Sequence, residues 1–283
     1  MSSRFRNLWN RTSRSDRITF LLGLTLTSFI IIVGVFADYV SPYDPIKVDM
    51  TRANVPPNPE NLMGTDVLGR DVLSRIIYGL RTSLTIAVIS VSISGILSLV
   101  LGSITGYVGG IVDRGLNLVM DALYAFPALV LAMIMAIFLG QGITNIAIAI
   151  SIAFTPFFTK VIRGAAIASK TKPFIEATKI AGGSNFYIVR RHILPRCLPS
   201  MSVLAAMGSL RAIVITASLG FLGVGVNPPT PEWGSDISLA KISFMGGTWW
   251  PLLFPGLTVA ITVLALDLLA EGLNTLVVLS SRG

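Results

Sequence analysis

Residues 176–195 read Glu-Ala-Thr-Lys-Ile-Ala-Gly-Gly-Ser-Asn-Phe-Tyr-Ile-Val-Arg-Arg-His-Ile-Leu-Pro and form a polar, basic stretch between long apolar segments. A loop that only joins two neighbouring helices needs a few residues. This one extends over residues 163–197 and keeps residues that favour helices. We therefore interpret it as a docking element on which a soluble partner can act.

The local signals in this stretch predict two short helices separated by a glycine bend. Pro173 suits the first turn of a helix, where its missing N–H costs nothing. Gly182 and Gly183 stand where a helix end requires a positive φ. Ser184 can cap a second helix through its hydroxyl. We expect this second helix to stop before Pro195, because proline does not continue a helix.

The composition indicates a membrane protein. Of the 283 residues, 53% are hydrophobic and 13% are charged, and the mean hydropathy is +0.75. Soluble domains contain roughly 25% charged residues. The single cysteine, Cys197, excludes an intrachain disulfide, and the single histidine, His192, excludes a metal site of the His/Cys type.

The fold class predicted is an all-α polytopic membrane protein with six transmembrane helices. A spanning helix needs about 20 apolar residues. Six segments satisfy this requirement: 18–37, 84–108, 117–139, 143–162, 198–221 and 252–279. A cleaved signal peptide is the alternative for segment 18–37, but its apolar run exceeds the usual length of roughly 7–15 residues.

Two basic clusters predict the orientation, because lysine and arginine concentrate on the cytoplasmic side. The first is the tail 1–17, with Arg4, Arg6, Arg11, Arg14 and Arg17. The second is the loop 163–197, with Arg163, Lys170, Lys172, Lys179, Arg190, Arg191 and Arg196. Six spans place both clusters and both termini in the cytoplasm. Segments 38–83 and 222–251 are then external, and residues 84–283 form a five-helix core.

The external segment 38–83 is rich in proline in its first part, which predicts an extended, folded-back loop. We expect Asp71 to Arg81 to form a short surface helix before the second span. Trp233, Trp249 and Trp250 fall where an interfacial aromatic belt is expected. Small residues within the spans, namely Gly95, Gly102, Gly106, Gly208 and Gly220, predict close helix packing.

Four stretches together resemble the permeases of ATP-binding-cassette importers. In the loop 163–197, Glu176-Ala177-Thr178, then Gly182, then Leu194-Pro195 resemble the family's EAA motif. The others are Gly64-Thr65-Asp66-Val67-Leu68-Gly69-Arg70-Asp71, Ala125-Phe126-Pro127, and the stretch from Phe221 to Gly234. The resemblance covers roughly residues 18–279 and is strongest to the C-type subunit of the dipeptide/oligopeptide/nickel branch. Two departures are Thr178, where alanine is usual, and His192, where isoleucine is common.

This resemblance implies the type I importer permease fold in the plasma (inner) membrane of a prokaryote. It also implies a second, B-type permease, two ATPase subunits and an external substrate-binding protein as partners. The loop 163–197, called the EAA loop below, would contact the ATPases. Its contact residues would be Phe174, Glu176, Ala177, Gly182, Gly183, Phe186, Leu194 and Pro195.

No phosphate-binding loop of the type G-x-x-x-x-G-K-[ST] occurs in the sequence. The chain is therefore expected to be a transporter subunit rather than an enzyme, without a cofactor of its own, while ATP and Mg²⁺ bind partner ATPases. Nucleic acid is not an expected partner, because the net charge of +8 is distributed as membrane topology requires. The resemblance implies a short peptide or a related small solute as cargo, and nickel chelates, glutathione, haem and modified sugars also remain open.

Charged residues within the spans are the remaining candidates for a site. Arg211 lies near the middle of the fifth span, where a charge costs at least about 2.5–3.5 kcal/mol and usually faces a cavity or a partner. It either lines the pathway and attracts a carboxylate or carbonyl of the substrate, or pairs with Asp267 or the second permease. Thr216 is the other pathway candidate, at a position where the family often has an acidic residue. Asp121, Asp267 and Glu271 are expected to serve structure or the inner mouth.

Two other classes of function remain as alternatives. An ion-coupled secondary transporter would show inverted repeats and acidic relays, and neither is evident. A membrane assembly subunit without a pathway would tolerate substitution of Arg211. Glu176 has the alternative role of stabilising its own helix through the dipole, and His192 is expected to be packed rather than to act as a pH switch.

Overall fold

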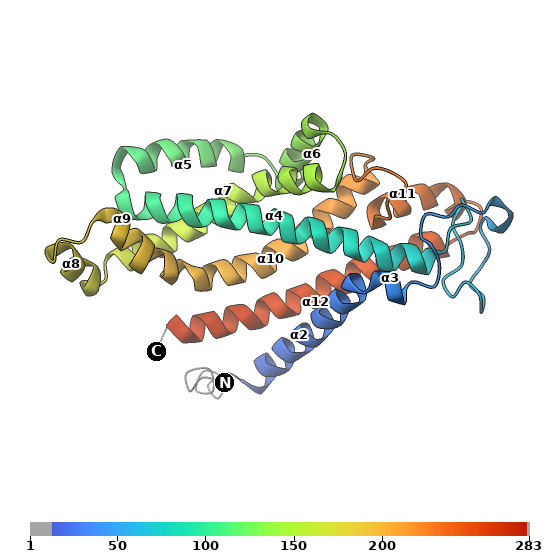
Figure 1. The fold of residues 1–283 in the computed structure, drawn as a ribbon, viewed down its shortest axis with the longest axis horizontal. Helices are drawn as coiled ribbons and strands as arrows, with labels where there is room; N and C mark the ends of the chain where they lie inside the picture. The colour runs from blue at the N-terminus through green and yellow to red at the C-terminus, as the bar shows by residue number, and fades with distance from the viewer. Residues whose placement is uncertain (1–12, 282–283) are drawn as a thin grey trace.

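The computed structural model describes residues 13–281, with side chains up to residue 277, and in this range every regular element is a helix. The bundle is elongated (Figure 1). Its helices are α2 (Arg14–Val35), α3 (Ala37–Val40), η1 (Met50–Arg52), α4 (Val72–Val108), α5 (Gly110–Tyr124), α6 (Ala128–Leu139), α7 (Ile143–Lys170), α8 (Pro173–Ile180), α9 (Asn185–Ile188), η2 (Val189–Ile193), α10 (Leu194–Phe221), α11 (Trp233–Phe244) and α12 (Trp250–Ser281). Arg4, Arg6 and Arg11 of the predicted basic tail lie outside the described residues.

Five helices in this range are long and apolar enough to cross a membrane: α2, α4, α7, α12 and the stretch Asn185–Phe221 that contains α10. The third predicted segment, 117–139, is not one straight helix. It belongs to α5 and α6, which meet at an angle of 91° and count as one span only if taken together. Pro127 precedes α6, and proline disfavours the helical conformation of the residue before it.

Some predicted boundaries were wrong. The expected short surface helix at 71–81 is the start of the 37-residue α4, which Asp71 caps by accepting a hydrogen bond from the Ser74 N–H at 2.8 Å. A separate helix would need a break after Arg81, and residues 80–94 contain no glycine or proline that could make one. The segment 143–162 continues to Lys170 because its polar last turns remain helical beyond the apolar run.

Helices α4 and α7 form the centre of the bundle, and small residues bring them close. A Cβ atom built on Gly102 would lie 2.9 Å from the Arg163 nitrogen, and one on Gly106 would lie 2.7 Å from the Ala166 Cβ. Between the helices, the Ser98 hydroxyl donates to the Thr155 carbonyl at 3.2 Å. The prediction of close packing at these glycines is therefore confirmed, as expected for helix pairs that associate in lipid.

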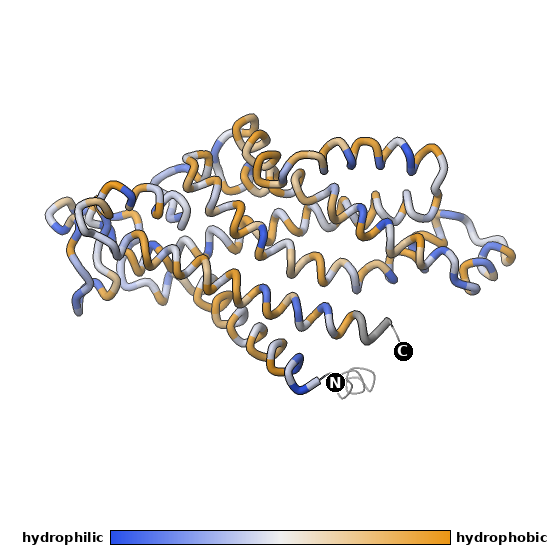
Figure 2. The backbone as a smooth tube through the Cα atoms, turned by 180° about the vertical axis from the view of Figure 1, so that it is seen from behind, coloured by the Kyte–Doolittle hydropathy of each residue, from blue (hydrophilic) through white to orange (hydrophobic). Residues whose placement is uncertain are grey.

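Helices α2 and α12 pack against each other through Gly23 and Gly272. A Cβ on Gly23 would collide with the Leu269 backbone, and one on Gly272 would meet Phe20 at 2.7 Å. Apolar residues run along the long helices, whereas hydrophilic residues gather mainly in the loops at the two ends (Figure 2). This distribution fits helices whose outer faces contact lipid.

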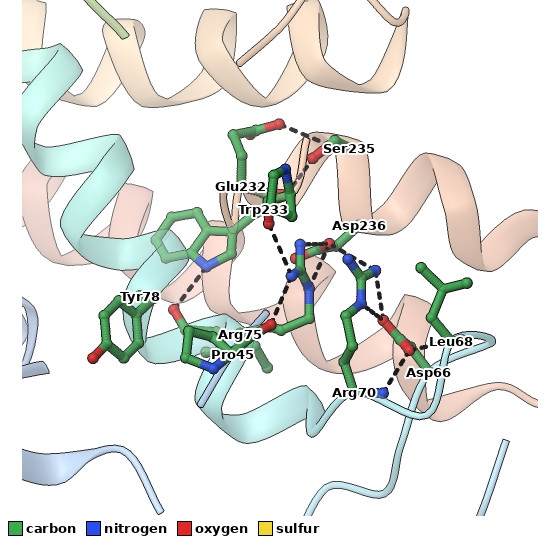
Figure 3. A network of polar contacts seen from close by, with 12 residues as sticks. Pro45, Asp66, Leu68, Arg70, Arg75, Tyr78, Glu232, Trp233, Ser235 and Asp236 are labelled. Atoms are coloured by element: carbon green, nitrogen blue, oxygen red, sulfur yellow. Dashed lines mark hydrogen bonds and ion pairs between the residues drawn. The ribbon is translucent and has the colours of Figure 1, made fainter. Parts of the chain in front are cut away.

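At one end, the segment between α3 and α4 folds onto α11 through a buried ionic cluster (Figure 3). Arg75 donates to the Asp236 Oδ1 at 2.9 Å through Nε and to the Pro45 carbonyl at 2.9 Å through Nη1. Arg70 pairs with Asp66 at 2.6 Å. Both arginines are at most 6% exposed. The cluster joins two stretches noted in the sequence, 64–71 and 221–234, to the start of α11.

The tryptophans at this end are mostly not the aromatic belt that the sequence predicted. Trp233 is fully buried, and its indole N–H donates to the Ile76 carbonyl at 3.0 Å. Trp250 is 8% exposed and donates to the Thr65 carbonyl at 3.0 Å. Each buried indole N–H thus finds a backbone carbonyl as acceptor and is not left unpaired. Only Trp249 of the three is largely exposed, at 45%.

Candidate functional sites: the EAA loop and the central cavity

The EAA loop contains the two short helices that the sequence predicts, α8 and α9, with Gly182 between them at a φ of +82°. The Ser184 side chain caps α9 by accepting from the Tyr187 N–H at 3.2 Å. The expected stop before Pro195 was wrong, because α9 continues through η2 into α10. η2 is a π-helical turn in which the Leu194 N–H donates to the Val189 carbonyl. This wider turn shifts the hydrogen-bond register, so that the missing N–H of Pro195 does not end the helix.

Tyr107, at the end of α4, fastens the loop to the bundle. Its side chain is buried, and its hydroxyl donates to the Asn185 Oδ1 of α9 at 3.0 Å. The Lys170 and Lys179 ammonium groups lie 5.7 and 5.3 Å from the centre of its ring, within the range of cation–π attraction. One tyrosine thus connects α4, α7, α8 and α9. We did not predict this role, since a tyrosine at a span end is also what an interfacial anchor looks like.

The inner face of the EAA loop is well packed. Ile175, Ile188 and Ile193 are each at most 1% exposed. His192 lies between two rings, at 5.7 Å from Phe174 and 5.8 Å from Tyr187. The apolar residues of the loop thus pack it against the bundle.

The outer face of the same loop is exposed. Phe186 is 73% exposed and Ile180 is 82% exposed, which is unusual for large apolar residues at a polar end of the molecule. Of the predicted contact residues, Glu176, Ala177, Gly182, Phe186 and Pro195 are exposed, whereas Phe174, Gly183 and Leu194 are half-buried. The structure therefore brings five of the eight to the surface and uses the other three partly for internal packing.

A second candidate site, which we call the central cavity, lies between α5, α6, α7 and α10. Its volume is about 590 Å³. The lining is mostly apolar and aromatic, and Arg211 is its one charged residue. The guanidinium carbon lies 5.4 Å from the centre of the Phe157 ring. The break between α5 and α6, at Ala125-Phe126-Pro127, forms part of the wall.

The other predicted charges lie elsewhere. Thr216 is 1% exposed, does not line the central cavity, and its Oγ1 has no hydrogen-bond partner among the described residues. Asp121 pairs with Lys160 at 2.7 Å. Asp267 and Glu271 are exposed on α12. Within residues 13–281 no ion pair joins Arg211 to Asp267, so the predicted pairing within the chain is not present.

A helical bundle with several membrane-length helices, a polar helical loop at one end and a cavity at mid-length is typical of a multi-pass membrane transport protein. The family model described as "Binding-protein-dependent transport system inner membrane component" matches residues 98–280. The chain belongs to this family. It is a permease subunit of an ATP-binding-cassette importer, in which separate subunits hydrolyse ATP.

Relatives over nearly the whole length agree with this assignment. The dipeptide transport system permease protein DppC of Haemophilus influenzae is 36% identical over 90% of this chain and 88% of that protein. The di/tripeptide permease DppC of Pseudomonas aeruginosa is 36% identical, covering 89% and 85%. The glutathione permease GsiD of Pectobacterium atrosepticum is 35% identical, covering 95% and 89%. The resemblance to the C-type permeases of the peptide branch is confirmed.

Proposed function

We propose that this chain forms half of a pathway that imports short peptides, together with a B-type permease. Two ATPase subunits, which bind ATP and Mg²⁺, and an external binding protein complete the complex. The observation that carries the proposal is the EAA loop, whose outer face exposes Phe186 and Ile180 while its inner face is packed. The similarity to dipeptide, di/tripeptide and glutathione permeases supports peptides as cargo.

The connections of the loop suggest how force passes from an ATPase to the pathway. An ATPase that displaces α8 and α9 moves Tyr107 of α4 through its hydrogen bond to Asn185. It also moves α10, because the helix from Asn185 to Phe221 is continuous. Arg211 lies on that same helix. Closure of the ATPase dimer would thus be transmitted to the wall of the central cavity.

Six spans with both termini in the cytoplasm, in the inner membrane of a bacterium, are the topology we propose. The start of α2 and the end of α12 lie toward the same end of the bundle as α8 and α9 (Figure 1). This arrangement supports an even number of crossings, with the pair α5–α6 as one broken span. Asp267 and Glu271 then belong to the inner half of the last span, where we propose that they face the inner mouth or the second permease.

Photo-cross-linking from the loop tests the proposal. In the assembled complex, Ala177→Cys carrying a benzophenone maleimide should cross-link to an ATPase subunit. The native Cys197 is fully buried and gives little background. Leu62→Cys, which is 66% exposed at the other end of the molecule, is the matched control and should not capture an ATPase. Failure of Ala177→Cys to capture an ATPase, in a complex that imports peptide on addition of ATP, would contradict the proposal.

A further inference from the structure

The family assignment does not explain what the central cavity could hold. Its volume of about 590 Å³ lies within the range of small-molecule pockets. The cavity opens on a surface formed by four elements of this chain, so its remaining wall would come from a partner. What it holds depends on the one charged side chain in its lining, Arg211.

Arg211 has no counter-ion among the described residues. The carbon of its guanidinium lies 5.4 Å from the centre of the Phe157 ring. By contrast, Lys160 lies 4.3 Å from the centre of the Tyr124 ring, which also lines the cavity, but is paired with Asp121 at 2.7 Å. The positive charge that remains uncompensated at the cavity is therefore that of Arg211.

The walls would strengthen binding of an anion by Arg211. Tyr124 and Phe157 are stacked, with ring centres 6.4 Å apart, and Phe154 and Phe158 are stacked at 5.7 Å. Aromatic walls exclude water, and electrostatic attraction grows as the local dielectric falls. The planar guanidinium fork matches a carboxylate and can bind it through two parallel hydrogen bonds.

We propose that Arg211 receives the C-terminal carboxylate of a peptide in transit, while the aromatic walls accept its side chains. The carboxylate is the one anion that unmodified peptides share, so a single arginine can serve peptides of different sequence. This inference rests on the proposed function, because it takes peptides as the cargo. The competing explanation is that Arg211 pairs with a carboxylate of the second permease.

The first test compares a peptide with its C-terminal amide in proteoliposomes that contain the full complex and its binding protein. Arg211→Gln should lower kcat/KM for ATP-driven import of dialanine at least tenfold and change import of dialanine amide less than twofold. Arg211→Lys should recover only part of the lost kcat/KM for dialanine, because it retains the charge but not the planar fork that makes two hydrogen bonds. Arg114→Gln, an exposed arginine of α5 outside the cavity, is the matched control and should have no effect.

Equal losses for the acid and the amide would show that Arg211 has a structural role and would overturn the inference while leaving the permease function intact. An unchanged rate of dialanine import by Arg211→Gln would overturn the inference as well. If the wild-type complex imported neither peptide on addition of ATP, the proposed cargo itself would be wrong, and the inference would fail with it.

A second test introduces a charge at position 211 by chemical modification after the complex has been assembled. It does not depend on whether the binding protein accepts the peptide amide. Arg211→Cys is modified in the reconstituted complex with 2-aminoethyl, 2-sulfonatoethyl or methyl methanethiosulfonate. The cationic adduct should raise dialanine import at least fivefold, and the neutral and anionic adducts should not. The wild-type complex, with its buried Cys197, controls for reaction elsewhere. Equal recovery with the neutral adduct would overturn the role of the charge.

Discussion

At the scale of single residues, Glu232 is an unusual ionisable group outside the spans. It is fully buried at the start of α11, and its carboxylate oxygens accept hydrogen bonds from the Gly234 and Ser235 N–H groups at 2.8 Å each. Burial raises the pKa of this carboxyl from 4.5 to about 7, although the two N–H donors oppose that shift. The folded protein therefore holds the proton more tightly than the unfolded chain does.

This raised pKa predicts how stability depends on pH. The contribution of Glu232 to the stability of the folded state is most favourable below pH 4.5. It declines as the pH rises to about 7 and is constant above that. Glu232→Gln removes this dependence but also loses one acceptor of the cap. We expect the variant to melt below the wild type, by a difference that narrows as the pH rises from 4.5 to 7. Between pH 4.5 and 7, the contribution of Glu232 to the free energy of unfolding of the wild type falls by up to about 3 kcal/mol. Thermal unfolding in detergent across this pH range measures it, and a constant difference would contradict the shifted pKa.

Gly182 is a second residue whose conformation matters. Its φ of +82° is one that side-chain-bearing residues rarely adopt, yet an added Cβ would meet nothing within 4 Å. Gly182→Val is therefore destabilising because valine disfavours this backbone conformation, at a cost of roughly 1–2 kcal/mol or more. Crowding by neighbouring atoms does not contribute. We expect the bundle to stay folded and ATP-driven uptake to be lost, because the bend between α8 and α9 changes. Gly164→Val in α7, where a Cβ also meets nothing and φ is not positive, is the control. Normal uptake by Gly182→Val would refute the coupling role of this bend.

At the scale of elements, hydrophobicity predicted that the long helices exist but not where two of them change direction. The break between α5 and α6 is invisible to a hydropathy window, because Tyr124, Ala125 and Phe126 are as apolar as their neighbours. A proline alone did not predict whether a helix ends, because the outcome depends on the neighbouring backbone. Pro127 stands at a 91° bend, whereas Pro195 continues a helix because a π turn precedes it. The helices of the EAA loop were predictable, since caps and glycines act locally, but the contact of Tyr107 with Asn185 joins residues 78 positions apart.

The pair α4–α7 offers a test of element packing. Gly102→Leu would place a side chain against the α7 backbone at Arg163, from which even a Cβ is only 2.9 Å away. Overpacking of this kind costs typically about 1–3 kcal/mol and occasionally more. We expect a lower melting temperature in detergent and less assembled complex on a native gel. Gly256→Leu in α12, where a Cβ meets nothing within 4 Å, should change neither. A wild-type melting temperature for Gly102→Leu would show that the two helices can separate freely.

At the scale of the whole molecule, the two ends differ in how they are held together. One end is fixed by buried ion pairs between Arg70, Arg75, Asp66 and Asp236. The other end is fixed by Tyr107 and buried isoleucines beneath an exposed surface. The central cavity lies between them, bordered by α10, which continues from the EAA loop. Displacement of the EAA loop, which is packed as one body with α4 and α10, would act on the cavity rather than on the outer loops, because the ion pairs hold the outer end together.

The distribution of basic residues predicts which end of the molecule faces which side of the membrane. In intact cells, a membrane-impermeant maleimide should label Leu62→Cys, which is 66% exposed. It should label Ala181→Cys, exposed on the EAA loop, only after the membrane is permeabilised. The physical reason is the basic charge of the EAA loop, which retains it in the cytoplasm. The unmodified chain is the control, because its one cysteine, Cys197, is buried. Labelling of Ala181→Cys from outside would place the loop beyond reach of any cytoplasmic ATPase, and the coupling mechanism would have to be abandoned.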